Sequence, residues 1–449
     1  MVSDKLRLLP AVHEVVKSLR EHPVSQSEKR LTWAARMAIQ QARERLLDNE
    51  INVVDEASIL VSALEVLEDS CVPAQVINAT GVILHTNLGR APLSEAAIAA
   101  VCAAAKSSDL EYDLTSGKRA SRNRLLSGPL AELTNTEEGF IVNNCAAALV
   151  LALAALGGKA TALARSQIIE IGGGFRLPDI MKASGVELME VGTTNRIRLS
   201  DYEEALEDGA AAILWMHRSN FEISGFTEEP SVEELRKVAD HYKVPLIYDL
   251  GTGLKWDTEL LNLRPEPTIC DKAVQLADVT LFSGDKLFGG PQAGVLVGKA
   301  SAIKRLSKHP LARALRADKL TMAAFAATIM SHLNDTPEDL PTYQMLRTSP
   351  EELMTRAERI LSSLPADVCR VVEVIDTVGG GTMPNSELPG LAIEISTSET
   401  EQFHRKLRAH PLPIVARIKD DAVLVHLRTI APHQLDTIIQ KLSKILKSK

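Results

Sequence analysis

The sequence contains few cysteines, and no two of them stand close together. An odd number of scattered cysteines without a CxxC pair indicates reduced thiols and excludes both a disulfide scaffold and a structural zinc site. We therefore predict a cytoplasmic protein that holds no metal ion. The five cysteines are Cys71, Cys102, Cys145, Cys270 and Cys369.

Long apolar runs are also missing. The longest extends from Cys145 to Leu156, which is too short to cross a bilayer, and Gly157 and Gly158 end it. The opening residues, 1 to 7, lack the apolar core of a signal peptide. We expect no membrane partner.

A surplus of basic residues is absent too, because the 449 residues carry a formal net charge of -8. The composition therefore shows no general affinity for nucleic acid, and an anionic partner must meet local basic patches. With 45% hydrophobic residues, the chain is long enough for one large core and one or two smaller domains.

Three parts follow one another along the chain. Residues 1 to 75 are predicted to be helical, and Glu28 to Leu47 has the pattern of an amphipathic helix with a basic face. Residues 76 to 330 alternate strand-like runs with helices, which is typical of a mostly parallel sheet covered by helices. Residues 331 to 449 are expected to form a small α+β domain, punctuated by Gly379-Gly380-Gly381. Strands are predicted at 141–142, 211–216, 244–253, 277–282, 391–395 and 422–427, and helices at 231–242 and from 432 onward.

One lysine, Lys286, stands in a loop of small residues directly after an apolar strand. Glycines there permit backbone conformations closed to other residues, and a serine adds a hydroxyl. A lysine in a closed pocket can lose its proton and attack an aldehyde, so Lys286 is a candidate for a Schiff base with a cofactor. The alternative is an exposed turn lysine. The small residues beside it are Ser283, Gly284, Gly289 and Gly290.

Two further segments favour a cofactor site. The strand at 244–253 delivers Asp249 at its carboxyl end, where open α/β sheets bind ligands and where an acid can keep the pyridine ring of pyridoxal phosphate protonated. The run at 141–149 ends a short strand in two asparagines before a strong helix former, and the amino end of a helix can hold a phosphate. Each segment alone also fits a turn or a simple cap. Together with the lysine they favour a bound cofactor.

Longer motifs run through the whole chain. They lie at 76–93, 110–114, 116–119, 170–173, 175–179, 190–196, in the loop of Lys286 and at 309–319. In residues and order, these motifs closely resemble bacterial selenocysteine synthase, the L-seryl-tRNA(Sec) selenium transferase family. The resemblance extends from the amino-terminal helices to the glycines at 379–381.

The resemblance implies a fold-type-I, aspartate aminotransferase-like α/β enzyme that depends on pyridoxal 5'-phosphate. Serine on L-seryl-tRNA(Sec) would lose its α-proton and hydroxyl on the cofactor, and the resulting aminoacrylyl intermediate would take selenium from selenophosphate to give L-selenocysteinyl-tRNA(Sec). Residues 1 to 75 are a candidate tRNA-docking domain because of their basic helical face. The family forms homo-oligomers, so at least a dimer or a ring of dimers is expected.

Roles for individual residues follow from this resemblance and from their chemistry. Lys286 would bind the cofactor and shuttle protons, and Asp249 would secure the pyridinium. His217 follows a predicted strand and either lies beside the cofactor ring or serves as a structural hydrogen-bonding group. Candidate phosphate ligands are Asn144, the N–H groups of Cys145 and Ala146, and Ser283.

Selenophosphate is a compact anion, so its site needs several cations at close range. The resemblance assigns this role to Arg90, Arg313 and Arg316. Arg313 and Arg316 stand three positions apart, and on one helical turn they would face the same way and clamp one anion. The alternative is a solvated basic helix face.

Several residues depart from the family pattern near the presumed cofactor and substrate. The family usually has asparagine, glutamate, threonine and glycine where this chain has Cys145, Gln167, Arg218 and Ala120. Two alternatives therefore remain: a small-molecule pyridoxal phosphate lyase of the same family, acting on an amino sugar phosphate or an amino acid, and a non-catalytic tRNA-binding paralogue. The amino-terminal domain argues against the lyase, and Lys286 with Asp249 argues against the paralogue.

Overall fold

The computed structural model describes residues 9–22, 26–47, 54–68, 73–171, 174–261, 263–379, 381–409 and 412–447. Contacts divide the chain into two units, Met1–Val76 and Ile77–Lys449. Several positions used in the sequence interpretation lie outside the described residues: 1–8, Cys71, Gly172, Gly173 and Gly380.

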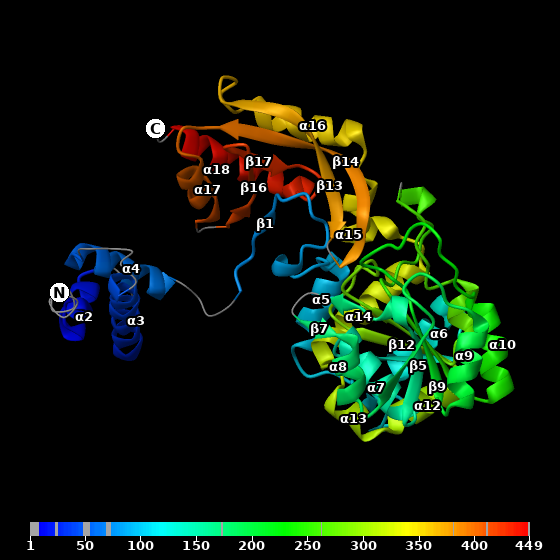
Figure 1. Ribbon diagram of the computed structural model, residues 1–449. Coiled ribbons are helices and arrows are strands. Elements are labelled where there is room, and N and C mark those ends of the chain that lie inside the picture. The colour runs from blue at the N-terminus through cyan, green and yellow to red at the C-terminus, as the bar shows by residue number, and fades with distance from the viewer. Residues whose placement is uncertain are drawn as a thin grey trace. The chain divides into compact units, whose positions relative to one another are not determined.

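Three helices, drawn in blue in Figure 1, form the described part of the first unit. α3 (Glu28–Leu47) has the predicted bounds and buries a row of alanines against α2 (Val12–Arg20) and α4 (Glu56–Glu68). Alanine favours the helix and allows a neighbouring helix to approach closely. Basic residues of the predicted polar face are exposed: Lys29, Arg36 and Arg43.

Seven strands form the central sheet of the second unit. One strand, β12, runs antiparallel to both of its neighbours, and all other neighbouring pairs are parallel. The predicted mostly parallel sheet is therefore confirmed. The order across the sheet is β4 (Glu138–Val142), β12 (Gly294–Gly298), β11 (Val279–Ser283), β10 (Leu246–Gly251), β9 (Ala212–Met216), β5 (Ala160–Ala164) and β8 (Glu187–Val191).

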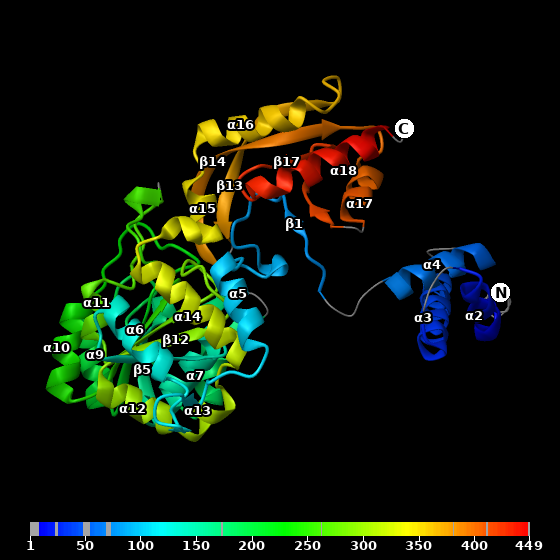
Figure 2. The ribbon, with the colours of Figure 1, turned by 180° about the vertical axis from the view of Figure 1, so that it is seen from behind.

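Helices cover both faces of this sheet (Figure 1, and from behind in Figure 2). One face packs against α7 (Cys145–Leu156), α8 (Leu177–Ala183) and α12 (Ala300–Lys308). The other packs against α6 (Arg124–Thr134), α9 (Leu199–Glu207), α10 (Val232–Tyr242) and α14 (Lys319–Leu333), and α5 (Glu95–Ala104) packs on α14.

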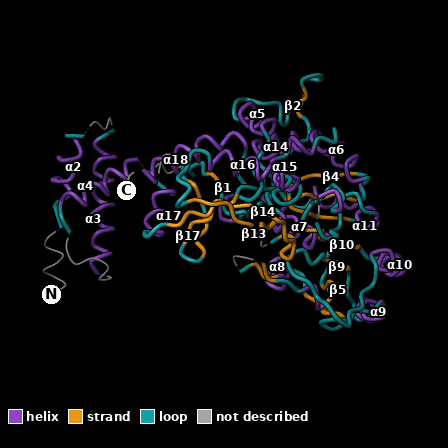
Figure 3. The backbone as a smooth tube through the Cα atoms, turned by 90° about the horizontal axis from the view of Figure 1, so that it is seen from above, coloured by secondary structure: helices purple, strands orange, loops and turns teal. Residues whose placement is uncertain are grey.

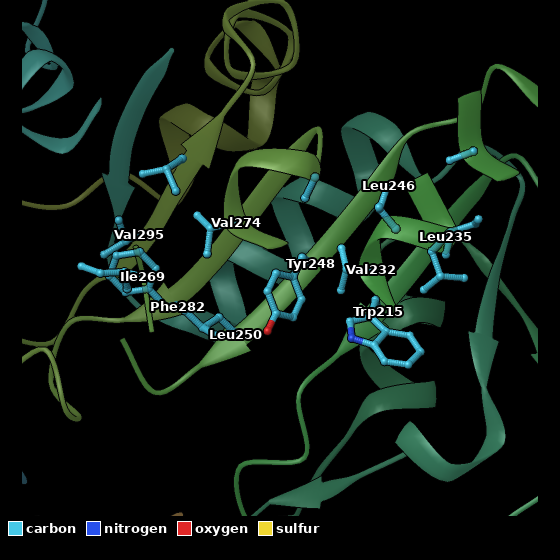
Figure 4. Close-up of a cluster of buried hydrophobic side chains, with 14 of the residues drawn as sticks. Trp215, Val232, Leu235, Leu246, Tyr248, Leu250, Ile269, Val274, Phe282 and Val295 are labelled. Carbon is cyan, nitrogen blue, oxygen red and sulfur yellow. The ribbon is translucent and has the colours of Figure 1, made fainter. Parts of the chain in front are cut away.

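Side chains alternate between these two faces, so each strand contributes to two apolar clusters. In β9, Ile213 and Trp215 join the cluster of α9 and α10, whereas Leu214 and Met216 join the cluster of α7. Figure 4 shows the first cluster, where Trp215, Tyr248 and Phe282 come from three neighbouring strands. Burial on both faces explains the nearly continuous apolar runs in the sequence.

A second sheet forms in the carboxyl-terminal part, and Figure 3 shows its strands as a separate orange group. All its neighbouring strands are antiparallel, in the order β13 (Cys369–Gly379), β14 (Thr382–Ser396), β17 (Ala422–His426) and β16 (Arg417–Lys419). α16 (Pro350–Leu361), α17 (Thr400–Arg408) and α18 (Leu435–Lys447) pack on it.

The chain enters the second unit through this carboxyl-terminal part. β1 (Ile77–Asn78) pairs in parallel with β15 (Ile414–Val415), and Ile77 joins the core of α16, α17 and α18. Residues 77–449 form one unit by their contacts, so the division at residue 330 stays a prediction.

The remaining elements are short. No helix among the described residues is both long and apolar enough to cross a bilayer. The short elements are β2 (Tyr112–Asp113), β3 (Lys118–Arg119), β6 (Glu170–Ile171), β7 (Phe175–Arg176), α11 (Lys272–Leu276), α13 (Pro310–Ala314), α15 (Pro341–Arg347) and the 3-10 turns Thr86–Leu88, Arg165–Gln167, Glu259–Leu261, Pro337–Asp339 and Pro432–Gln434.

Candidate active site

A cavity of about 250 Å³ lies at the carboxyl edge of the central sheet. The ends of β4, β9, β10 and β11 meet there, as expected for the ligand-binding edge of an open α/β sheet. Most of the residues predicted for the site line this one cavity. Its lining comprises Arg90, Asn144, Cys145, Ala146, Leu149, Ile169, Met216, His217, Ser219, Asp249, Gly251, Ser283, Asp285, Lys286 and Gln292.

Strand alternation places Asp249 in the cavity. Its neighbours Tyr248 and Leu250 point into the cluster under α10, so Asp249 points to the face that carries α7. Met216 is its register partner on β9 and packs toward α7 as well. The backbone pattern of β10 therefore aims the carboxylate beneath the amino end of α7.

Asp249 is the most strongly perturbed acid in the cavity. It is 7% exposed, and its Oδ1 has no hydrogen-bond partner among the described residues. Burial raises the pKa of this carboxyl to about 6, although the nearby Lys286 charge opposes the shift. A buried acceptor without a donor matches a pyridinium N–H, so the site fits the ring of pyridoxal phosphate.

Lys286 is 8% exposed and its side chain lines the cavity, which excludes the exposed turn lysine. The glycines around it act differently from the prediction. Gly289 alone among the three has a left-handed backbone, with φ of 73°. Gly284 is required for space, because a Cβ there would lie 2.6 Å from the carbonyl oxygen of Pro291. Close packing of the loop, more than unusual dihedral angles, explains the small residues.

The amino end of α7 supplies an anion site. Asn144 is the N-cap, and its Oδ1 accepts a hydrogen bond from the Ala147 N–H at 2.8 Å. The first N–H groups of a helix have no partner within it, so those of Cys145 and Ala146 remain available to an anion. Ser283, at the end of β11, lines the same cavity. Asn144 therefore caps the helix with its side-chain oxygen, as in the alternative interpretation of this segment as a simple helix cap.

The thiol of Cys145 replaces an amide near this anion site. Burial raises the pKa of Cys145 far above its usual range, with the Asp249 carboxylate adding to the shift. The thiol therefore stays protonated and neutral. The substitution changes the hydrogen-bonding capacity of the cavity and leaves its charge unchanged.

His217 lies in the cavity and contacts an acid that the sequence interpretation missed. Its Nε2 lies 3.0 Å from Oε1 of Glu266, whose side chain is 7% exposed. Its backbone N–H donates to the carbonyl oxygen of Asp249 at 2.8 Å. The imidazole therefore lies within ion-pair distance of Glu266, although these two atoms do not form a hydrogen bond with each other.

Arg90 reaches the cavity from a tight turn far away in the sequence. Its backbone is left-handed, with φ of 62°, and its N–H donates to the His85 carbonyl oxygen at 3.1 Å. Its Nη1 donates to Oδ2 of Asp285 at 3.0 Å. The guanidinium therefore enters the cavity already paired with the acid next to Lys286.

Arg313 and Arg316 do not line the cavity, and both are exposed. The prediction that they share one helical turn is wrong, because α13 ends at Ala314. Arg316 instead forms an isolated bridge with Val142 at the end of β4, and its Nη1 lies 3.8 Å from Oε1 of Glu111. Their role as anion ligands therefore stays a prediction, and it is no longer supported by a shared helical turn.

Two departures from the family pattern have structural partners. Arg218 donates to Oε2 of Glu229 at 2.8 Å and lies within 3.4 Å of Oγ of Ser166, so its charge is paired. Gln167 is fully buried and accepts the Met216 N–H at 2.9 Å.

Several lining residues were missed by the sequence interpretation. Asp285 and Gln292 lie in the same loop as Lys286, and this position in the sequence could have indicated that they line the cavity. Ile169, which also lines the cavity, and Glu266, which lies beside His217, come from loops without any local pattern. Only the folded chain brings these two to the site.

Among solved structures, that of D-glucosaminate-6-phosphate ammonia-lyase is similar to this chain, with a TM-score of 0.58 and 19% identity. The similarity covers 84% of this chain and 96% of that one. The two chains share a fold, and in this chain a lysine and an acid lie at the carboxyl edge of the sheet, as the predicted fold-type-I class requires. The predicted fold class and cofactor are confirmed.

The family model of L-seryl-tRNA selenium transferase matches residues 76–431. The L-seryl-tRNA(Sec) selenium transferase of Clostridium botulinum (strain Okra / Type B1) is 37% identical over 456 residues, covering 98% of this chain and 99% of the relative. That of Moorella thermoacetica is 39% identical over 458 residues, covering 98% and 97%. The chain belongs to the L-seryl-tRNA selenium transferase family.

The raised pKa of Asp249 predicts a pH-dependent stability of the cofactor-free protein. The folded chain keeps the Asp249 proton up to about pH 6, whereas the unfolded chain releases it near pH 3.8, the usual pKa of an aspartate side chain. The stabilisation is therefore present at low pH and lost as the pH rises through 6. Relative to Asp249→Asn, the parent should lose about 2 kcal/mol of unfolding free energy between pH 4.5 and 7. Urea unfolding measures this, and equal pH dependence in both proteins would contradict the buried carboxyl.

Proposed function

We propose that this chain converts L-seryl-tRNA(Sec) to L-selenocysteinyl-tRNA(Sec) with selenophosphate as the selenium donor. The observation that supports this best is the convergence of Lys286, Asp249 and the amino end of α7 on one cavity. Each supplies one contact that pyridoxal phosphate needs: an amine for its aldehyde, an acid for its ring nitrogen and N–H groups for its phosphate.

Bound in the cavity, pyridoxal phosphate supplies an electron sink for negative charge at the α-carbon of serine. Lys286 binds the cofactor through Nζ and, once free, holds and moves a proton with the same atom. Asp249 holds the ring N–H through Oδ1, which is otherwise without a partner among the described residues. The N–H groups of Cys145 and Ala146 and the hydroxyl of Ser283 orient the phosphate.

Selenophosphate is proposed to bind near Arg90. Arg90 lines the cavity, and its pairing with Asp285 fixes the guanidinium without removing all of its donors. Arg313 and Arg316 are proposed to bind selenophosphate before it enters the cavity. Their exposure makes them accessible to an incoming ligand.

The first unit is proposed to dock the tRNA. Lys29, Arg36 and Arg43 stand seven residues apart on α3, so they share one exposed face. Trp33 lies on that face between the first two and is 43% exposed. Cations and an exposed indole suit phosphate contact and base stacking. A small-molecule lyase has no use for such a surface, which favours the tRNA substrate.

The chain is proposed to act in the cytoplasm as a homo-oligomer, a dimer or a ring of dimers. Large apolar side chains are exposed on neighbouring helices of the second unit, including Ile98 on α5 and Leu320 and Met330 on α14. Burial in an interface between copies would remove them from water. Sedimentation velocity of the purified chain measures the assembly directly.

The central test is conversion of seryl-tRNA(Sec) by the purified protein with pyridoxal phosphate and selenophosphate. We expect selenocysteinyl-tRNA and, after borohydride reduction, a cofactor label on Lys286 alone. Lys286→Ala should lose both the label and the conversion, whereas Lys299→Ala, at the opposite edge of the sheet, should keep both. A label on another lysine contradicts the site. A labelled protein that cleaves an amino sugar phosphate and spares seryl-tRNA contradicts the proposed substrate.

The arginines are tested by separating loss of the serine hydroxyl from capture of selenium. Arg313→Ala and Arg316→Ala should each slow capture at limiting selenophosphate by up to about fivefold, since an exposed ion pair contributes up to about 1 kcal/mol. Hydroxyl loss should stay unchanged. Single-turnover assays at limiting and saturating selenophosphate measure both steps, with Lys304→Ala on the exposed face of α12 as the control. If both steps slow together, the arginines hold the tRNA or the fold instead.

The α3 surface is tested by its salt dependence. Replacing Lys29, Arg36 and Arg43 with Ala should weaken seryl-tRNA binding and reduce the slope of log affinity against log salt by about 2, because each phosphate contact contributes about 0.7–0.9. The control removes three exposed lysines from the second unit: Lys182, Lys237 and Lys272. Equal slopes in the two triple variants would assign α3 a purely structural role.

A further inference from the structure

The two carbonyl groups that follow Lys286 are held from behind by buried side chains. The hydroxyl of Tyr343 donates to the carbonyl oxygen of Leu287 at 2.5 Å. Nε2 of His332 lies 2.7 Å from the carbonyl oxygen of Phe288. Tyr343 and His332 are both fully buried. The backbone of the lysine loop therefore has fixed partners outside the cavity, on α15 and α14.

His332 can act as a donor here over a wide pH range. Burial lowers the pKa of its imidazole to about 3, so the ring is neutral. A carbonyl oxygen only accepts, so the single ring proton lies on Nε2 and Nδ1 is bare. The ring packs between Phe288 and Trp256, with centroid distances of 4.3 and 4.8 Å, which fixes its plane.

α15 is in turn held by the carboxyl-terminal sheet. At its end, the carbonyl oxygens of Met345 and Thr348 accept hydrogen bonds from Nη1 of Arg428 at 3.1 and 3.0 Å. Arg428 also donates to the Pro389 carbonyl oxygen at 2.6 Å and, through Nε, to Asp376 at 3.1 Å. One guanidinium thereby joins α15 to β13 and β14.

Arg428 belongs to a buried ionic cluster with Asp376 and His426. His426 Nδ1 lies 2.7 Å from Oδ1 of Asp376, and the three side chains are 4% exposed or less. Charges buried this deeply persist only when they are paired and hydrogen-bonded. The space is tight, because a Cβ on Gly81 or Gly390 would lie 2.2 or 2.1 Å from a carboxylate oxygen of Asp376.

A second connection from the same cluster reaches the other side of Lys286. Gly81 lies against Asp376 and His426, and the next residues bond to β13, with the Leu84 N–H donating to the Val378 carbonyl oxygen at 2.7 Å. This segment continues into the turn that carries Arg90, which pairs with Asp285. Asp285 and Leu287, the two neighbours of Lys286, are therefore both tied to the carboxyl-terminal sheet.

Apolar packing follows the same route. Leu287 belongs to a buried cluster with Tyr343 of α15, Leu84 of the entering segment, and Val378 and Leu388 of the carboxyl-terminal sheet. The lysine loop thus packs against the carboxyl-terminal part through side chains as well as through hydrogen bonds. A displacement of that part must be transmitted to the loop, because packed interiors do not deform continuously.

We propose that Tyr343 and the Asp376–His426–Arg428 cluster position Lys286, so that the carboxyl-terminal sheet sets the place of the cofactor lysine. Tyr343 and Arg428 are positioning residues, since neither lines the cavity. The inference rests on the proposed function only in taking Lys286 as the lysine that binds the cofactor. It assigns the buried ionic cluster a task in the active site beyond stabilising its own sheet.

Hydrogen exchange of the full chain tests the first connection without any substrate. Amides of the loop are protected by its own hydrogen bonds, such as the Gly290 N–H to the Gly284 carbonyl oxygen at 2.8 Å. Tyr343→Phe removes one hydroxyl and should speed exchange in the peptide 284–290 by about two- to tenfold. Tyr202→Phe, at an equally buried tyrosine on α9, should leave that peptide unchanged.

Arg428→Lys tests the second connection. A lysine keeps the positive charge beside Asp376 but cannot reach the three carbonyl oxygens at once. Exchange in 284–290 should again accelerate about two- to tenfold, and the pH midpoint of the visible absorption of the lysine-bound cofactor should shift. Arg370→Lys is the control, because Arg370 pairs with Glu394 between β13 and β14, within the carboxyl-terminal sheet.

The outcomes separate this inference from the proposed function. Loop exchange and absorption that match the controls in both Tyr343→Phe and Arg428→Lys would overturn the positioning role. If Arg428→Lys does not fold, Tyr343→Phe alone decides by the same two measurements. If the parent protein does not transfer selenium but loop exchange is altered in both variants, the proposed substrate is wrong and the positioning role is still supported.

Discussion

The site depends on one electrostatic arrangement, a carboxylate and an amine buried together at the end of an apolar sheet. Asp249 and Lys286 are both less than a tenth exposed, and the positive charge of Lys286 opposes the rise in the pKa of Asp249 that burial causes. Neither would be retained there without a partner, because an unpaired buried charge costs several kcal/mol. A cofactor that brings an aldehyde and a protonated ring nitrogen satisfies both groups at once.

The surrounding structure keeps the charges of the cavity balanced. Arg90 enters paired with Asp285, His217 faces Glu266, and Arg218 is turned away to Glu229. The N–H groups at the amino end of α7 add a positive potential to that of Lys286 in the same cavity. An anion entering the cavity is drawn to that end, which is where the phosphate of the cofactor is expected.

Much of the site was predictable because its signals are local. The strand of β10, the N-cap at Asn144 and the small-residue loop of Lys286 each occupy a short run of sequence, and each lies where the pattern indicated. The helical clamp of Arg313 and Arg316 failed for a local reason as well. His309 and Pro310 begin a helix that lasts only one turn, so spacing alone gave the wrong geometry.

By itself, the sequence determined the mostly parallel sheet and the placement of Lys286 and Asp249 at its carboxyl edge. Alternation, capping and chain order are sufficient for these. Only the tertiary structure decided that Arg90 meets Asp285, 195 positions away, and that Tyr343 holds the carbonyl group of Leu287. Such contacts depend on how distant segments pack around a common core, and no short run of residues carries that information.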